Sequence, residues 1–145
     1  MKHWFSMKKL FALLVLFLSL ASVSAQNKGS QKKPDIYFTE STFDFGQIEN
    51  NTLAKHDFVF FNSGTAPLLL KDVKASCGCT VPLWPRQPIK PGEIAKISVT
   101  FDPKDETGKI FNKTIKVTTN IKDGDHDKMV VIYIKGKVTA APSSN

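Results

Sequence analysis

Apolar and polar residues alternate with a period of two along most of the chain after residue 34. Between residues 95 and 101, for example, Ile97, Val99 and Phe101 alternate with lysine, serine and threonine. This period, built from β-branched and aromatic residues, is typical of strands that bury one face. No window shows sustained helical spacing with caps, so the pattern predicts an all-β domain. The predicted strands lie at 36–38, 43–45, 53–61, 68–73, 95–101, 111–119 and 130–138.

Turn-forming residues separate these predicted strands. Glycine, proline, asparagine and aspartate supply the fixed or positive φ that a chain needs where it reverses direction. About seven short strands with this spacing predict a single antiparallel β-sandwich. The turn sequences are Asn62-Ser63-Gly64, Pro91-Gly92, Asp102-Pro103 and Asp123-Gly124-Asp125.

Residues 1–25 have the pattern of a secretory signal peptide. Lysines come first, the stretch from Leu10 to Ala25 has no charge, and Val23-Ser24-Ala25 places small residues where a signal peptidase cleaves. The alternative is an uncleaved membrane anchor, but the apolar run is shorter than the roughly 20 residues that span a bilayer and contains serines. Neither cysteine lies near the cleavage site, so we expect no lipid-modified cysteine anchor. The sequence predicts export to the periplasm or the medium of a Gram-negative bacterium, with cleavage after Ala25.

The rest of the chain divides into three predicted parts. Residues 26–33 contain no apolar side chain and are expected to form a mobile leader. Residues 34–139 are expected to form the β-sandwich domain, and residues 140–145 a flexible tail.

Composition and charge exclude several classes of protein. Of the 145 residues, 41% are apolar and 23% are charged, which is ordinary for a globular domain and unlike collagen, a coiled coil, an acidic disordered tail or a disulfide-dense scaffold. The net charge of +7 arises mainly before Pro34, and 14 basic and 13 acidic residues remain after that point. A nearly balanced, exported domain is not expected to bind nucleic acid.

A series of motifs between residues 43 and 119 resembles a known family. Phe43-Asp44-Phe45-Gly46 is followed by residues 58–64 (FVFFNSG), then by Ser76-Cys77-Gly78-Cys79-Thr80 and by residues 88–93 (PIKPGE). This order is similar to that of the bacterial domain of unknown function family fifteen-seventy-three, which is common in exported proteins of the Bacteroidota. The resemblance implies an immunoglobulin-like sandwich, akin to major sperm protein and abnormal-spindle/Hydin domains. It implies no activity, because none is established for that family.

The pair Cys77 and Cys79 is the sharpest chemical feature of the sequence. Two residues apart on a strand, both sulfurs point to one face, and Gly78 permits the bend that a disulfide between them needs. The pair is interpreted first as a local structural disulfide or as two packed thiols. The alternatives are a redox-active pair and a soft-metal site that uses two thiolates. A metal site needs more ligands, and after the signal segment only His56 and His126 are available as histidines, neither near the cysteines in sequence.

Residues 84–91 form the second unusual segment. They contain three prolines and Trp84, the only tryptophan after the signal segment. Proline keeps such a segment extended at low entropic cost, and Trp84 with Arg86 is a combination typical of binding hot spots. The alternative is that Trp84 closes one end of the sandwich core.

No catalytic constellation is evident in the sequence. Two histidines make a Ser-His-Asp arrangement improbable, and Asp105-Glu106 has the character of a surface charge pair. Asp123, Asp125 and Asp127 imitate a calcium loop, but the glycine and the final acid are in the wrong places, which favours a solvated hairpin tip.

The sequence therefore predicts a non-enzymatic binding or structural module of the bacterial cell envelope. We expect no cofactor, no metal, no nucleic acid and no membrane span after signal cleavage. The expected partner is an envelope protein or surface component, bound through a loop near residues 79–91 that contains Trp84 and Arg86. The alternative function is thiol-redox or soft-metal handling by Cys77 and Cys79.

Overall fold

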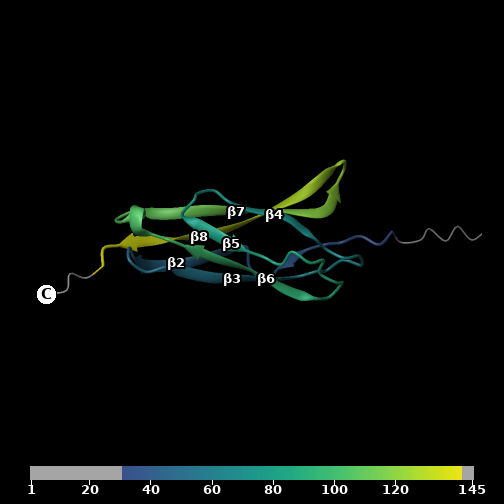
Figure 1. The fold of residues 1–145 in the computed structure, drawn as a ribbon, viewed down its shortest axis with the longest axis horizontal. Helices are drawn as coiled ribbons and strands as arrows, with labels where there is room; N and C mark the ends of the chain where they lie inside the picture. The colour runs from purple at the N-terminus through teal and green to yellow at the C-terminus, as the bar shows by residue number, and fades with distance from the viewer. Residues whose placement is uncertain (1–30, 142–145) are drawn as a thin grey trace, which may run out of the picture. The chain divides into compact units, whose positions relative to one another are not determined.

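The computed structural model describes residues 31–141, whose strands lie in two four-stranded sheets (Figure 1). One sheet has the strand order β1-β3-β6-β5 and the other β2-β8-β7-β4. A single turn of 3-10 helix, η1, follows β6. The strands are β1 (Tyr37–Phe38), β2 (Thr42–Glu49), β3 (Ala54–Phe61), β4 (Leu70–Ala75), β5 (Thr80–Leu83), β6 (Ile94–Phe101), β7 (Ile110–Asp123) and β8 (His126–Thr139), and η1 is Lys104–Glu106.

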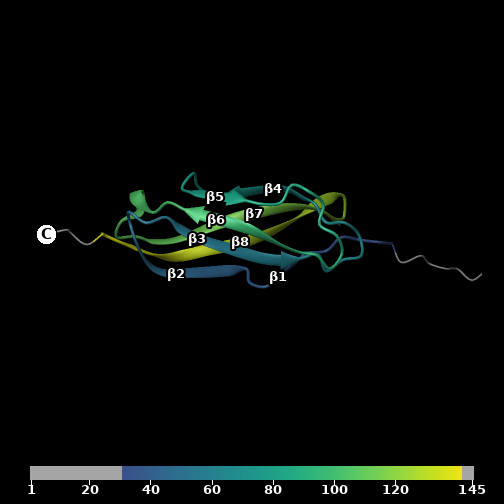
Figure 2. The same cartoon turned by 60° about the horizontal axis from the view of Figure 1, so that its bottom comes forward.

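The two sheets form the β-sandwich that the alternation predicts. In Figure 2, β3 and β6 lie in front of β7 and β8. Neighbouring strands are antiparallel except for β2 and β8, which run parallel. All seven predicted strands are present, and the structure adds β5. The sequence did not predict β5 because it is only four residues long and contains Pro82.

The core between the sheets consists of the apolar residues on the inward side of the alternation. Phe101 of β6 stacks on Phe111 of β7, with ring centroids 4.3 Å apart, and so joins the two sheets. Lysines occupy the outward side, among them Lys96, Lys116 and Lys135. The largest fully buried side chains are Phe58, Phe60, Leu68, Leu70, Ile97, Val99, Phe101, Ile115, Val117, Ile132, Ile134 and Val138.

An irregularity marks the pairing of β2 with β8. The register shifts between Asp44 and Gln47, and Gly46 lies there with a φ of 65°. On β8, Gly136 faces this bulge so closely that a Cβ atom would come 2.8 Å from the Gly46 carbonyl oxygen and 2.9 Å from the Phe111 ring. The parallel contact therefore depends on a residue without a side chain at position 136.

The fully buried Asn62 holds one end of the sandwich together. Its amide nitrogen Nδ2 donates to the carbonyl oxygens of Ala66 and Ile89, at 2.8 and 2.9 Å. Its Oδ1 accepts from the backbone N–H of Gly64 at 2.9 Å and of Asp35 at 3.4 Å. One side chain thus joins the end of β3, the following loop, the segment before β6 and the start of the domain.

The chain is attached to the sandwich from Lys33 onward. The Lys33 carbonyl accepts hydrogen bonds from the N–H groups of Thr65 and Ala66, at 2.8 and 3.2 Å. Gly64 lies so close to Lys33, Pro34 and Asp35 that a Cβ atom there would overlap their backbone. The predicted signal peptide, most of the predicted leader and residues 142–145 of the tail lie outside the described residues. Among residues 31–141, no helix is long and apolar enough to cross a membrane.

Candidate functional site

The structure joins Cys77 and Cys79 by a disulfide in the turn between β4 and β5. Their Cα atoms are 5.2 Å apart, within the usual range for a disulfide, whereas an extended chain would hold them at about 6.5–7 Å. The bend at Gly78 accounts for the difference. The hydroxyl of the buried Thr80 lies 3.4 Å from the Cys77 sulfur and 3.9 Å from the Cys79 sulfur.

The strand that follows the disulfide, β5, is an edge strand that pairs only with β6. The N–H of Asp102 donates to the Cys79 carbonyl at 2.8 Å, so Cys79 faces β6 and, by alternation, Pro82 faces the open edge. Proline has no N–H, and Pro82 therefore removes a donor from that edge. Val81 and Leu83 have outward-facing side chains that are 55% and 66% exposed. Strand β5 thus presents apolar side chains on its outer face, while its backbone edge has little capacity to pair with another strand.

Trp84 directly follows β5 and is partly buried against the core. The guanidinium of the exposed Arg86 lies over its ring, with Cζ 3.6 Å from the ring centroid. The indole Nε1 is buried and has no hydrogen-bond partner among the described residues. Trp84 therefore helps to close the space between the two sheets next to β5. Arg86 covers the part of the Trp84 ring that faces outward.

The segment beyond Trp84 is fixed in place at Ile89. The N–H and carbonyl groups of Ile89 and Leu68 bond to each other at 2.7 and 2.9 Å, and Asn62 donates to the same Ile89 carbonyl. Ile89 is itself buried in the core. Residues 80–89 are thus held at both ends, by the disulfide turn and by this bridge. We call the outward side chains of this segment, Val81, Leu83 and Arg86, together with Trp84, the β5 surface.

The structure does not bring the disulfide and Trp84 into contact. The sequence predicts a loop over residues 79–91, but the first part of that segment is strand β5. Cys79 and Trp84 are five residues apart along an extended chain, a separation of roughly 17 Å. The two sequence-predicted sites therefore lie at opposite ends of β5.

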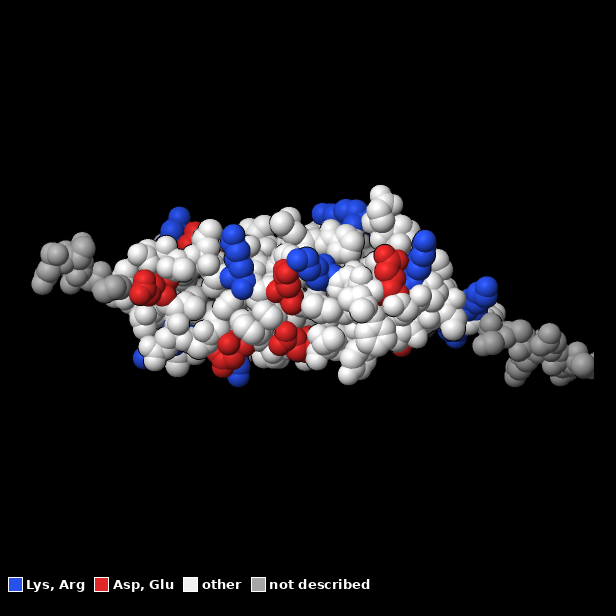
Figure 3. Space-filling model, turned by 90° about the horizontal axis from the view of Figure 1, so that it is seen from below, with Lys and Arg blue, Asp and Glu red and all other residues white. Residues whose placement is uncertain are grey.

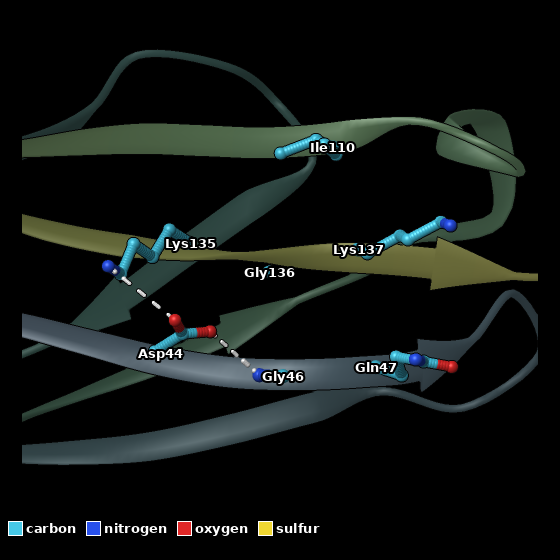
Figure 4. Close-up of a pocket in the computed structure, with 7 residues that line it drawn as sticks. All are labelled: Asp44, Gly46, Gln47, Ile110, Lys135, Gly136 and Lys137. Carbon is cyan, nitrogen blue, oxygen red and sulfur yellow. Dashed lines mark hydrogen bonds and ion pairs between the residues drawn. The ribbon is translucent and has the colours of Figure 1, made fainter.

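A shallow hollow lies on the outer face of the second sheet, where β2 bulges away from β8 (Figure 4). It has a volume of about 320 Å³ and is lined by Asp44, Gln47, Ile110, Lys135 and Lys137 together with the two glycines of the bulge. The Asp44 carboxylate accepts from the Gly46 N–H at 2.8 Å and lies 3.5 Å from the Lys135 amino group. No residue pattern in the sequence predicts this hollow, because it arises from a register shift between β2 and β8.

The histidine considered as a metal ligand is engaged elsewhere. His56 Nε2 lies 2.8 Å from the Glu40 carboxylate, and its ring stacks on Phe43 with centroids 3.6 Å apart. His126 is exposed at the β7–β8 hairpin. Within residues 31–141 no group of three or more His, Cys, Asp or Glu side chains is arranged to hold a metal ion.

Acidic side chains are tied into ion pairs with lysines. Hydrogen bonds from Lys122 and Lys71, at 2.8 and 2.6 Å, lower the pKa of Asp127 to about 2. A hydrogen bond from Lys113 likewise lowers the pKa of Glu106. Asp127 therefore links the β7–β8 hairpin to β4, as a structural ion pair. On the face shown in Figure 3, acidic and basic side chains are interspersed and neither sign dominates.

Comparison with protein families gives one match that covers most of the chain. The family described as "Protein of unknown function (DUF1573)" matches residues 36–138. This confirms the resemblance drawn from residues 43–119 and extends it through β8. No curated protein matches the sequence.

Solved structures with this fold come from bacteria and from humans. A protein of unknown function from Porphyromonas gingivalis W83 is 22% identical with a TM-score of 0.62, over 73% of this chain and 47% of that protein. This chain thus corresponds to about half of the Porphyromonas protein. The ASH/PapD-like domain 7 of human CEP192 is 14% identical, also with a TM-score of 0.62, over 83% of this chain and 98% of that domain. The YadV chaperone is 11% identical with a TM-score of 0.55, over 76% of this chain and 55% of that protein. At these identities the likeness shows the fold alone, which is that of an immunoglobulin-like, PapD-like sandwich.

Proposed function

The chain belongs to the DUF1573 family of proteins of unknown function, and we propose that it is an exported, non-catalytic module that binds another protein of the bacterial cell envelope. The proposed contact is the β5 surface. The main observation in support of this contact is that Val81 and Leu83 expose large apolar side chains on a strand that is fixed at both ends. Ordered, exposed apolar side chains lower the entropic cost of binding a partner.

The charged neighbour of this surface adds to its suitability for binding. Arg86 follows the exposed Leu83 three positions later and already stacks on Trp84, so its guanidinium is ordered before any partner arrives. Arginine and tryptophan are enriched among the residues that contribute most to protein interfaces. The disulfide turn fixes the start of the strand, and the Ile89 bridge fixes the chain beyond Arg86.

Export and the absence of catalysis are part of the same proposal. Support for export is the signal-peptide pattern of residues 1–25. N-terminal sequencing of the protein from the producing cells is expected to give Gln26 as the first residue. Recovery of Met1 in exported material would contradict this step.

The binding surface is tested by site-specific photocrosslinking in whole cells. A photoreactive residue at position 83 is expected to give a discrete crosslinked protein, and Arg86→Ala is expected to weaken that crosslink strongly. The matched control is position 110, because Ile110 is 82% exposed on the other sheet and lies outside the proposed surface. The test places its probe at Leu83 rather than Trp84, since replacing Trp84 would also disturb the core.

Two results would contradict the proposal. The first is the same set of crosslinked proteins from positions 83 and 110, with no effect of Arg86→Ala. The second is turnover of a thiol-disulfide substrate by the purified protein at catalytic rates, which would favour the redox hypothesis for Cys77 and Cys79.

A further inference from the structure

Strand β8 has a second edge that is covered over only part of its length. β2 pairs with β8 from Thr42 opposite Tyr133 to Glu49 opposite Thr139. Before Tyr133, no strand of the described chain pairs with this side of β8, because residues 37–38 pair with β3 in the other sheet. Figure 2 shows β2 beside the half of β8 that leads to the C-terminus.

The direction of the free backbone groups follows from one hydrogen bond. The Tyr133 N–H donates to the Ser41 carbonyl at 2.8 Å, so Tyr133 points its backbone groups toward β2. Every second residue of a strand does the same, which places the N–H and C=O groups of Val131 and Met129 on the uncovered side. The backbone N–H and C=O groups of Val130 and Ile132 point the other way, toward Val117 and Ile115 of β7.

This stretch of edge has none of the features that block the other edges. β1 is two residues long, β5 contains Pro82, and β2 and β4 both have register shifts. In contrast, β8 pairs with β7 without a shift from Met129 to Lys137. A regular strand with unpaired backbone groups is a template for a further strand.

The charges of the adjoining sheet face indicate what kind of strand fits. Lys74 and Lys116 lie directly opposite each other in the same cross-strand row as Val131. In the next cross-strand row of the outer face, Asp72 lies opposite Thr118, which pairs with Met129, so one carboxylate shares this face with Lys74 and Lys116. Lys137 lies further along the face, and none of these three lysines has a carboxylate partner among the described residues. Like charges placed opposite each other are unfavourable, and acidic side chains nearby relieve that repulsion.

The inward side of an added strand would have a different environment. Side chains of a strand alternate between the two faces, so those pointing inward would lie along the seam of the sandwich. Val130 of β8 is partly buried against the core there, and the ion pair of Lys128 with Asp35, at 3.8 Å, brings the start of the domain beside it. Ile36, which follows Asp35, is also partly buried against the core. Apolar side chains fit that seam.

We propose that the open edge of β8, at Met129 and Val131, binds an extended segment of a partner protein as a fifth strand of the β2-β8-β7-β4 sheet. The segment alternates acidic residues, which face the lysines, with apolar residues, which cover the seam. Backbone hydrogen bonds give the binding, and the lysines select the acidic sequence. This surface is separate from the β5 surface, so the inference goes beyond the proposed function.

The test uses a hexapeptide of alternating glutamate and valine with blocked ends, titrated into the purified protein and followed by NMR. Saturable shifts are expected at the amides of Met129 and Val131. A peptide with lysine in place of glutamate is expected to bind about tenfold more weakly, since charge complementarity is lost. Leu83→Asp is expected to leave peptide binding unchanged, which separates this proposal from the β5 surface.

Two methylated peptides provide the decisive comparison. N-methylation of the three glutamates and N-methylation of the three valines remove hydrogen-bond donors from opposite sides of the strand. One of these peptides is expected to keep its affinity and the other to lose at least about tenfold, and which one loses it reports the strand orientation. Three results would each overturn the proposal: equal affinities of the two peptides, shifts confined to residues away from β8, or a free protein that sediments as a dimer and protects the amides of Met129 and Val131 from exchange.

Discussion

The two proposed interaction surfaces of this sandwich, at β5 and at β8, differ in what they offer a partner. At β5 the backbone edge is interrupted by Pro82, while Val81, Leu83 and Arg86 point outward. At β8 the side chains of Val130 and Ile132 are partly or fully buried, while the backbone groups of Met129 and Val131 are open. One edge is therefore suited to recognition by side chains and the other to recognition by the main chain.

The strand edges of this sandwich are protected in different ways against pairing with other chains. Proline, a register shift or a very short strand blocks each outermost strand, and the open stretch lies on an inner strand that β2 covers only in part. An inner position limits which segments can approach, because β2 and the chain near Asp35 flank the site on both sides. Each of the changes described next should affect one of these surfaces more than the other.

Asn62→Ala should have the largest effect. It removes four hydrogen bonds at a fully buried site, takes the Asn62 donor from the Ala66 carbonyl, and leaves the Ile89 carbonyl with the Leu68 N–H alone. We expect the free energy of unfolding to fall by about 3 kcal/mol or more, since each unsatisfied buried polar group costs roughly 1–3 kcal/mol. Urea unfolding measures the loss, and proteolysis should show that residues 84–91 open first. Asn120→Ala is the control, because Asn120 makes similar bonds at a more exposed site and should cost less.

Gly136→Ala should loosen the contact of β2 with β8. A Cβ atom there would meet the Gly46 carbonyl and the Phe111 ring, so we expect a loss of about 1–3 kcal/mol, as is usual for overpacking. Amide exchange in residues 42–49 should accelerate, and exchange in β5 should not. Gly78→Ala is the matched control, since a Cβ atom at Gly78 meets nothing within 4 Å. A stability equal to that of the unchanged protein would show that β2 does not depend on the close approach at Gly136.

Replacing Cys77 and Cys79 together by serine should have a modest effect on stability. The disulfide closes a very short loop, so its constraint on the unfolded chain is small, and we expect a loss of roughly 1–2 kcal/mol. Binding at the β5 surface should weaken, because the start of the strand is no longer fixed, while peptide binding at β8 should not change. Complete loss of folding would mean that the disulfide has a larger structural role than its loop length implies.

Asp127→Asn should have the smallest effect on stability of these four changes. It should alter how the stability of the β7–β8 hairpin depends on acid pH. The pKa of Asp127 is lowered from 3.8 to about 2 by Lys122 and Lys71, so its ion pairs stabilise the fold above about pH 4. That contribution is lost as the pH falls through the folded-state pKa, in the window from about 4 to 2. Unfolding measured across this window should show a shallower pH dependence for Asp127→Asn than for the unchanged protein. Identical slopes would contradict the role of Asp127.

The sequence predicts the β-sandwich well because alternation and turn residues act locally. Ile97, Val99 and Phe101 alternate as a strand must if one face is buried, and the structure buries all three. The sequence does not predict β5, because a proline such as Pro82 argues against a strand unless that strand is known to lie at the edge of a sheet. The hydrogen bonds of Asn62 reach residues 27 positions away in both directions along the chain, so no local pattern predicts them.

The candidate sites were accessible from the sequence only in part. The spacing of Cys77 and Cys79 indicated their proximity, and the structure joins them. The stacking of Arg86 on Trp84 and the exposure of Leu83 could not be predicted from the sequence, because both depend on where β5 ends. The open edge of β8 required the register of β2, which is set by a bulge between Asp44 and Gln47. The binding role of Trp84 and Arg86 stays a prediction.

Residue-resolved amide exchange of the free protein tests most directly whether the two edges differ as described. The N–H of Val130 faces Val117 of β7 and that of Val81 faces Thr100 of β6, so both should exchange slowly. The N–H groups of Val131 and Met129 face the open edge and should exchange much faster than that of Val130. Protection of Val131 equal to that of Val130 would show that the edge of β8 is already covered, and would contradict the account.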